Sequence, residues 1–150
     1  MKKSSILILT IVTLAIATLT IGAGSGATFK PKKSSDSILG TWQLASYKYG
    51  TTQSGFTDVS KSLPHLKLIT DTHFTWTTFD TYSHKVISSA GGTYTLEGNT
   101  YTESIDFGFG MNSYLGQKQT FTIQVKGNMF FLSGSLSDGY KIEEIWQRVK

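Results

Sequence analysis

Two glutamates in strand-like segments are the residues best placed to do chemistry. Glu103 falls between Tyr101 and Ile105 on the apolar face of an alternating segment, and Glu144 stands two positions before Trp146 in another. Alternation of apolar and polar residues is typical of a strand with one buried face. A carboxylate on such a face is either buried and paired or faces a cavity.

Three uses of two inward carboxylates follow from their chemistry. They could form an acid–base pair, bind a cation, or act as internal partners for Arg148 and for tyrosine hydroxyls. We favour the structural role. Internal ion-pair networks shift pKa values as active sites do, so two inward carboxylates do not by themselves indicate catalysis. An enzyme that uses Glu103 with a tyrosine or with His73 ranks last, so we expect a protein that is not an enzyme.

The histidines do not form a recognisable metal motif. His65 opens a segment, His84 stands in a polar turn, and alternation turns His73 away from the face of Phe74 and Trp76. Their spacing matches no zinc signature, and the chain has no cysteine to supply a thiolate. No G-x-S-x-G nucleophile motif is present either. We therefore predict no metal and no cofactor.

Short antiparallel strands must position these side chains. The clearest pair is a hairpin within 91–110, turned by Gly98 and Asn99. No segment after residue 27 has a helical period. The other predicted strands are 38–49, 65–70, 72–79, 85–89, 117–126, 129–135 and 140–149.

Such a series of neighbours predicts an all-β antiparallel meander. A meander of eight or nine strands avoids exposed edges by closing into a barrel, with a β-sandwich as the alternative. An eight-stranded barrel is wide enough to be filled by side chains or to hold one small ligand. The polar connection 50–64 carries three apolar residues, Phe56, Val59 and Leu63, which we expect to cover the mouth of the barrel.

The two ends of this domain resemble the lipocalin family. Gly40 and Trp42 form a G-x-W sequence on the first strand, and Arg148 stands near the end of the last. The resemblance implies that Arg148 stacks on Trp42 and closes one end of the barrel. The chain is similar to small bacterial exported lipocalin-like proteins of unassigned function in segments 66–76, 91–94, 101–103 and 144–148. It is shorter than a typical lipocalin and lacks the family's C-terminal helix and disulfide.

The resemblance also implies a small hydrophobic ligand inside the barrel. The candidate lumen residues are Trp76, Tyr94, Tyr101, Glu103, Glu144 and Trp146. The aromatic residues expected to face inward are Trp42, Trp76, Tyr94, Tyr101, Phe121, Phe131 and Trp146. The alternative is a structural or protein-interaction module whose barrel is filled by these side chains and holds no ligand.

The N-terminus predicts export. Residues 1–27 run from two lysines through an apolar stretch to small residues, the order of a secretory signal peptide, and 28–37 form a polar linker to a domain at 38–150. We expect a periplasmic or secreted protein without a stable membrane span after cleavage; an uncleaved, membrane-anchored form is the alternative. Five of the fourteen basic and one of the ten acidic residues precede Ile38. The domain is therefore formally neutral, which argues against nucleic-acid binding.

Overall fold

The structure, a computed structural model, describes residues 37–150. The predicted signal peptide and the predicted linker up to residue 36 lie outside the described residues. The strands are β1 (Gly40–Tyr49), β2 (Thr57–Asp58), β3 (His65–Ile69), β4 (His73–Phe79), β5 (Val86–Glu97), β6 (Thr100–Phe109), β7 (Lys118–Lys126), β8 (Met129–Ser135) and β9 (Lys141–Arg148). A short 3-10 turn, η2 (Asn112–Tyr114), joins β6 to β7. No helix within this part of the chain is long and apolar enough to cross a membrane.

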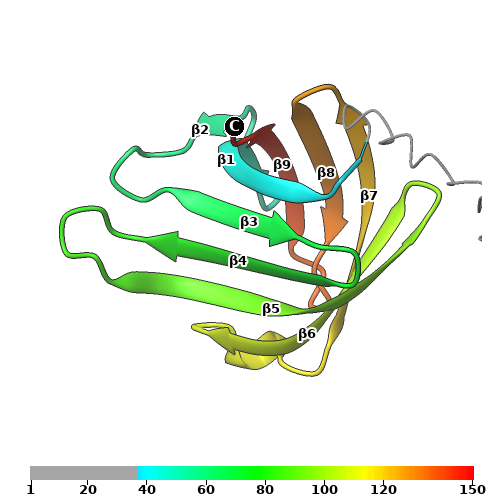
Figure 1. The fold of residues 1–150 in the computed structure, drawn as a ribbon. Helices are drawn as coiled ribbons and strands as arrows, with labels where there is room; N and C mark the ends of the chain where they lie inside the picture. Colours follow the sequence, from blue (N-terminus) through cyan, green and yellow to red (C-terminus); the bar gives the residue numbers. More distant parts are fainter. Residues whose placement is uncertain (1–36) are drawn as a thin grey trace, which may run out of the picture. The chain divides into compact units, whose positions relative to one another are not determined.

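Antiparallel pairing of neighbours closes the sheet into a barrel (Figure 1). β1 pairs with β3 through its first residues and with β9 along most of its length. Eight strands therefore form the closed wall, and the two-residue β2 adds to β1 outside it. The predicted all-β meander and lipocalin-like barrel are confirmed. Closure leaves β1 and β9 paired with each other, so neither forms an exposed edge.

Gly-Asn turns join two of the hairpins. Gly98 and Asn99 connect β5 to β6, with Glu97 paired to Thr100 on either side. Gly98 has φ +60°, the left-handed conformation that the first position of a type II′ turn requires. Gly127 has φ +59° in the corresponding turn between β7 and β8. The hairpin predicted within 91–110 is therefore present with the expected turn.

A bulge makes that hairpin different from the prediction in one respect. Gly91 pairs with Phe107 and Gly92 with Ile105, so Asp106 is an extra residue on β6. One extra residue turns the following side chains to the other face. The alternation of Tyr101, Glu103 and Ile105, continued without a bulge, would turn Phe107 inward; it instead points outward and is 56% exposed. In addition, the predicted strand 85–89 and the first arm of the hairpin are one continuous strand, β5.

The inward residue of β8 is Phe130, and the prediction that Phe131 faces inward was wrong. Phe130 pairs with Trp146 of β9, and Leu132 pairs with Glu144. Directly opposed residues of antiparallel strands project from the same face of the sheet. Two consecutive phenylalanines carry no period of their own, so the pairing with β9 decides which one is buried.

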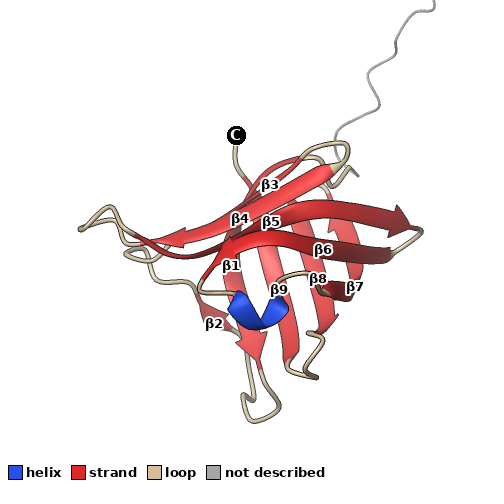
Figure 2. Ribbon diagram, turned by 90° about the horizontal axis from the view of Figure 1, so that it is seen from below, coloured by secondary structure: helices blue, strands red, loops and turns tan. Residues whose placement is uncertain are grey.

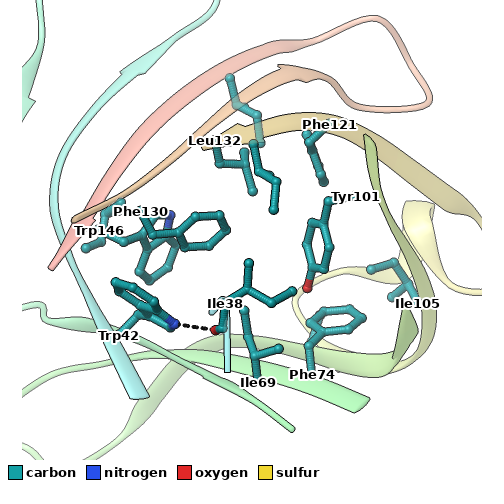
Figure 3. Close-up of a cluster of buried hydrophobic side chains, with 14 residues drawn as sticks. Ile38, Trp42, Ile69, Phe74, Tyr101, Ile105, Phe121, Phe130, Leu132 and Trp146 are labelled. Carbon is teal, nitrogen blue, oxygen red and sulfur yellow. Dashed lines mark hydrogen bonds between the residues drawn. The ribbon is translucent and has the colours of Figure 1, made fainter. Parts of the chain in front are cut away.

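Large side chains fill the end of the barrel where β1 begins (Figure 3). Trp42, Tyr101 and Phe130 are fully buried, with Trp42 and Phe130 ring centroids 5.3 Å apart. Ile38, which precedes the first strand, packs among them, and its carbonyl accepts a 2.7 Å hydrogen bond from the Trp42 indole. This end is the filled part of the hydrophobic core, which continues into the walls of the barrel.

Arg148 covers the outside of that core. Its guanidinium carbon lies 4.0 Å from the centroid of the Trp42 ring. The same guanidinium donates hydrogen bonds of 2.6 Å to the carbonyls of Leu39 and Ser37. A cation stacked on an indole and tied to the entering chain links the first strand to the last. We call this end, formed by Ile38, Trp42 and Arg148, the floor of the barrel.

Candidate functional site

A cavity of about 340 Å³ lies inside the barrel, toward the end opposite the floor. Its lining includes Tyr49 at the end of β1, His65 at the start of β3 and Thr78 near the end of β4. β1 runs from the floor to Tyr49, and the antiparallel pairing of β1 with β3 and of β3 with β4 places His65 and Thr78 at that same far end of the wall. The barrel is therefore filled near the floor and hollow above it.

The mouth of this cavity is formed by two connections. Met111 and Tyr114, from the β6–β7 connection that contains η2, line one side, and Leu136 and Tyr140, next to the β8–β9 turn, line another. Figure 2 shows η2, drawn in blue, in the connection that follows β6. The Tyr114 hydroxyl donates a 2.7 Å hydrogen bond to Asp138 Oδ2, which joins the two connections.

A buried ion pair stands at the bottom of the cavity. Lys67 Nζ of β3 lies 2.8 Å from Glu103 Oε1 of β6, and each side chain is only 4% exposed. Lys67 pairs in register with Trp42, so it lies next to the layer that forms the floor. Its Nζ is also 5.1 Å from the centroid of Trp146. Partner carboxylate and aromatic faces together compensate the desolvation of the ammonium group.

Glu144 of β9 is the second buried carboxylate. The Tyr49 hydroxyl donates to its Oε1 at 2.7 Å, and the Trp146 indole donates to its Oε2 at 3.0 Å. Burial raises the pKa of Glu144, while Lys67 and the two donors act in the opposite direction. Burial, followed by the neighbouring Glu144, raises the pKa of Tyr49. The phenol therefore stays protonated and serves as a donor.

His65 adds a neutral imidazole to the same wall. Its ring lies between those of Trp76, at 4.8 Å, and Trp146, at 5.1 Å. Burial, with a smaller effect of Lys67, lowers the pKa of His65 to about 3. His65 Nε2 is buried and has no hydrogen-bond partner among the described residues. One polar atom of the cavity wall is therefore unsatisfied.

Together these groups give the cavity a polar bottom and apolar walls. Lys67, Glu103 and Glu144 contribute one positive and two negative formal charges, whereas Phe121, Leu132 and other apolar side chains complete the lining. Within residues 37–150, no three histidine, aspartate, glutamate or cysteine side chains gather as metal ligands. The arrangement suits a small molecule with an apolar body and a polar end.

The predicted lumen residues divide between the cavity and the core. Tyr101 lies in the filled half, where it is fully buried and its hydroxyl has no hydrogen-bond partner among the described residues. Tyr94 stacks at 5.2 Å on Tyr101, and its hydroxyl donates to the carbonyl of Thr70 at 2.7 Å. Four of the six predicted lumen residues line the cavity: Trp76, Glu103, Glu144 and Trp146.

Sequence reasoning missed the partner of Glu103. Arg148 or a tyrosine hydroxyl was expected, but the partner is Lys67. Lys67 lies on the same face of β3 as His65 and Ile69, and this face points inward. The neighbouring Leu66 and Leu68 suggest the opposite orientation, in which Lys67 would be exposed. The apolar residue Ile69 was the available signal. If Ile69 faces inward, alternation along the strand turns Lys67 and His65 inward as well.

The connection 50–64 does not line the cavity. Phe56, Val59 and Leu63 were expected to cover the mouth, but none of them is among the cavity-lining residues. Residues of this connection form β2, which extends the sheet next to β1 by pairing with Ser46 and Tyr47. Pairing to the edge of β1 holds the connection at the wall. The mouth is bordered instead by η2 and the β8–β9 turn.

Known structures with this architecture define the class of fold as lipocalin-like. One is a lipocalin-like protein from Bacteroides uniformis ATCC 8492, with a TM-score of 0.55 and 17% identity, covering 75% of this chain and 98% of that one. Another is an uncharacterized protein from Bacteroides eggerthii DSM 20697, with a TM-score of 0.53 and 13% identity, covering 75% of this chain and 100% of the other. At these identities the similarity concerns the fold. Among curated proteins, none matches the sequence.

Within this class the chain belongs to the family described as Domain of unknown function (DUF4488). The sequence profile of that family matches residues 37–150. The match therefore covers the barrel from the residue before Ile38 to the last residue, including both the floor and the cavity.

Proposed function

We propose that the protein binds a small, largely hydrophobic molecule in the upper half of its barrel. The observation that supports this most directly is the cavity of about 340 Å³, lined by aromatic and aliphatic side chains around a few buried polar groups. Small-molecule sites are typically concave, mainly apolar and about 300–1,000 Å³ in volume. The cavity is at the lower end of this range, which favours a compact ligand.

An unsatisfied polar atom at the cavity supports a ligand over a purely structural interior. Among the described residues His65 Nε2 has no hydrogen-bond partner, and leaving a buried polar atom unpaired costs about 1–3 kcal/mol. A filled barrel without a ligand remains a good description of the half around Trp42 and Phe130. It does not explain the space between Trp76, Leu132 and Trp146.

We also propose that the protein is exported and that it binds its ligand without converting it. The basic, apolar and small-residue order of residues 1–27 is that of a secretory signal peptide, so we place the binding activity in the periplasm or outside the cell. N-terminal sequencing of the protein recovered from the producing cells tests this. A new N-terminus near residue 28 supports export, whereas an intact Met1 on the exported protein would contradict cleavage.

Ligand binding is tested by filling the cavity from one wall. Ser88 of β5 lines the cavity, while its neighbour Ser89 points to the other face of the same strand. An environment-sensitive apolar dye should bind the native protein and the Ser89→Phe control, and Ser88→Phe should weaken its binding at least about tenfold by steric exclusion. Equal binding by both variants, or no binding of any apolar compound to the native protein, would contradict the proposed function and favour a structural module.

A further inference from the structure

The ion pair at the bottom of the cavity has hydrogen-bonding capacity that the protein does not use. Resting on the proposed function, we infer that the polar end of the ligand is an uncharged group that accepts and donates hydrogen bonds side by side, such as a carboxamide or lactam. The observations that carry this inference are the unused donors of Lys67, the unused acceptor of Glu103 and the charges around them.

Lys67 supplies the unused donors. An ammonium group carries three N–H donors, and Nζ makes one hydrogen bond, to Glu103, among the residues described. Its other close neighbours are the rings of Trp146, Phe74 and Tyr101, at 5.1, 5.9 and 5.9 Å. Aromatic faces attract the charge but are weaker acceptors than a carbonyl oxygen. A ligand carbonyl at the bottom of the cavity would complete the coordination of Nζ.

Glu103 supplies the unused acceptor beside it. Its Oε1 accepts from Lys67, and apart from an interaction with the neighbouring Tyr101 hydroxyl the carboxylate accepts no further hydrogen bond from the residues in 37–150. A carboxylate can accept about four hydrogen bonds, so it has room for a further donor. Glu103 and Lys67 both line the cavity. A group that accepts from Lys67 and donates to Glu103 would therefore satisfy both members of the pair without separating them. His65 Nε2, the unpaired atom of the same wall, offers a third polar contact.

Charge decides against the ionic alternatives. A ligand carboxylate would suit Lys67, but it has no donor for Glu103 and would place a second carboxylate directly beside that of Glu103. A ligand ammonium would suit Glu103, but it has no acceptor for Lys67 and would approach that cation. In a medium of low dielectric constant, like-charge contacts are costly. A neutral donor–acceptor group avoids both.

Compounds with one alkyl chain and different polar ends test the inference on the native protein. Calorimetric titration at pH 7 compares octanamide, octanoate, octylamine and N,N-dimethyloctanamide, which keeps the carbonyl and lacks the donors. We expect octanamide to bind about tenfold or more tightly than each of the others, since each of them loses a charge-assisted hydrogen bond or adds a like-charge contact. Octanoate or octylamine binding as tightly as octanamide would overturn the inference and leave the proposed function standing.

A double substitution then locates the preference. In Lys67→Met with Glu103→Leu, residues of similar volume replace both members of the pair, so no buried charge remains. We expect this variant to bind octanamide and N,N-dimethyloctanamide with equal affinity, and an undiminished preference for octanamide would overturn the inference. If none of the four compounds binds the native protein and no apolar dye binds either, the proposed function fails together with the inference.

Discussion

The Lys67–Glu103 pair is the residue-scale feature on which the interior depends. Both side chains are almost completely buried, and Lys67 has aromatic rings on three sides. Such a pair is rarely the most stabilising choice for a core, because desolvation of the charges offsets much of their attraction. Its presence at the bottom of a cavity is consistent with the proposed role in ligand recognition.

Breaking the pair from one side should be more harmful than removing it. Lys67→Met leaves Glu103 as an uncompensated buried carboxylate, so we expect the free energy of unfolding to fall by about 3–5 kcal/mol. Chemical denaturation measures this loss. Adding Glu103→Leu should restore most of it, and a double variant as unstable as the single one would show that packing, not charge, explains the effect.

His65 should make the protein less stable in mild acid. The pKa of His65 is lowered from 6.5 to about 3 in the folded state. Between these pH values the unfolded chain binds a proton that the folded chain does not. Stability therefore falls as the pH falls through this window, by at most about 1.4 kcal/mol for each pH unit.

The substitution His65→Gln isolates this contribution. It removes the titration and keeps a polar side chain, so unfolding free energies measured from pH 7 to pH 4 should decline less steeply in the variant. The raised pKa of Glu144 acts in the opposite direction, because the folded protein then takes up that proton at a higher pH than the unfolded chain. An equal pH slope in the two proteins would contradict the assignment of the buried, neutral imidazole.

At the residue scale, prediction from the sequence succeeded for the two inward-facing glutamates. Glu103 and Glu144 were identified because each interrupts an apolar face, and both line the cavity. Lys67 escaped notice because Leu66 and Leu68 suggest an apolar face on the wrong side of a five-residue strand. A strand this short has too few alternations to fix its orientation, and only its pairing with β1 and β4 does so.

At the scale of elements, the bulge in the β5–β6 hairpin changes which residues face the lumen. Gly92 lies where the two strands come closest. A Cβ on Gly92 would meet the backbone carbonyl of Ser104, whereas a Cβ on its neighbour Gly91 would meet the outer end of the exposed Phe107 ring. A backbone atom cannot move aside without disturbing the ladder, but an exposed ring can turn.

These two glycines offer a matched comparison of close approach. Gly92→Ala should lower the free energy of unfolding by about 1–3 kcal/mol, as overpacking in a tight site does. Gly91→Ala should cost less than about 1 kcal/mol, because Phe107 can change its rotamer. Thermal or chemical unfolding of both variants measures the difference. Equal destabilisation would mean that the hairpin is looser at the bulge than described.

The mouth of the cavity is held by a contact between two connections. The hydrogen bond from Tyr114 to Asp138 joins the η2 connection to the β8–β9 turn. If ligands pass between these segments, Tyr114→Phe should raise the rates of ligand association and dissociation together, with little change in affinity. Stopped-flow fluorescence with the apolar dye measures both rates. Unchanged rates would place the route of ligand exchange elsewhere.

Strand order and turns could be derived from the sequence, whereas local irregularities could not. Alternation and the Gly-Asn turns were sufficient to predict the meander, because neighbouring strands joined by tight turns must pair. The bulge at Asp106 and the burial of Phe130 in place of Phe131 depend on pairing between strands. The sequence of one strand does not contain that information.

At the scale of the whole barrel, the molecule combines a solid floor with a hollow upper half. Of the two interpretations made from the sequence, the filled interior describes the half near the floor, whereas ligand binding stays a prediction for the hollow half. The floor followed from the resemblance of Gly40, Trp42 and Arg148 to the lipocalin pattern, and the stacking of Arg148 on Trp42 has that form. The volume above it depends on how every inward side chain packs, which composition and period do not specify.

The three tryptophans allow one measurement to test this division. Trp76 and Trp146 line the cavity, whereas Trp42 lies in the floor and is not part of the cavity lining. Titrating octanamide into ¹⁵N-labelled protein and following the three indole N–H signals by NMR reports on each region separately. We expect the signals of Trp76 and Trp146 to shift in a saturable manner while that of Trp42 stays in place. No shift of Trp76 or Trp146 with octanamide or any apolar compound, or an equal shift of Trp42, would contradict a ligand cavity above a closed floor.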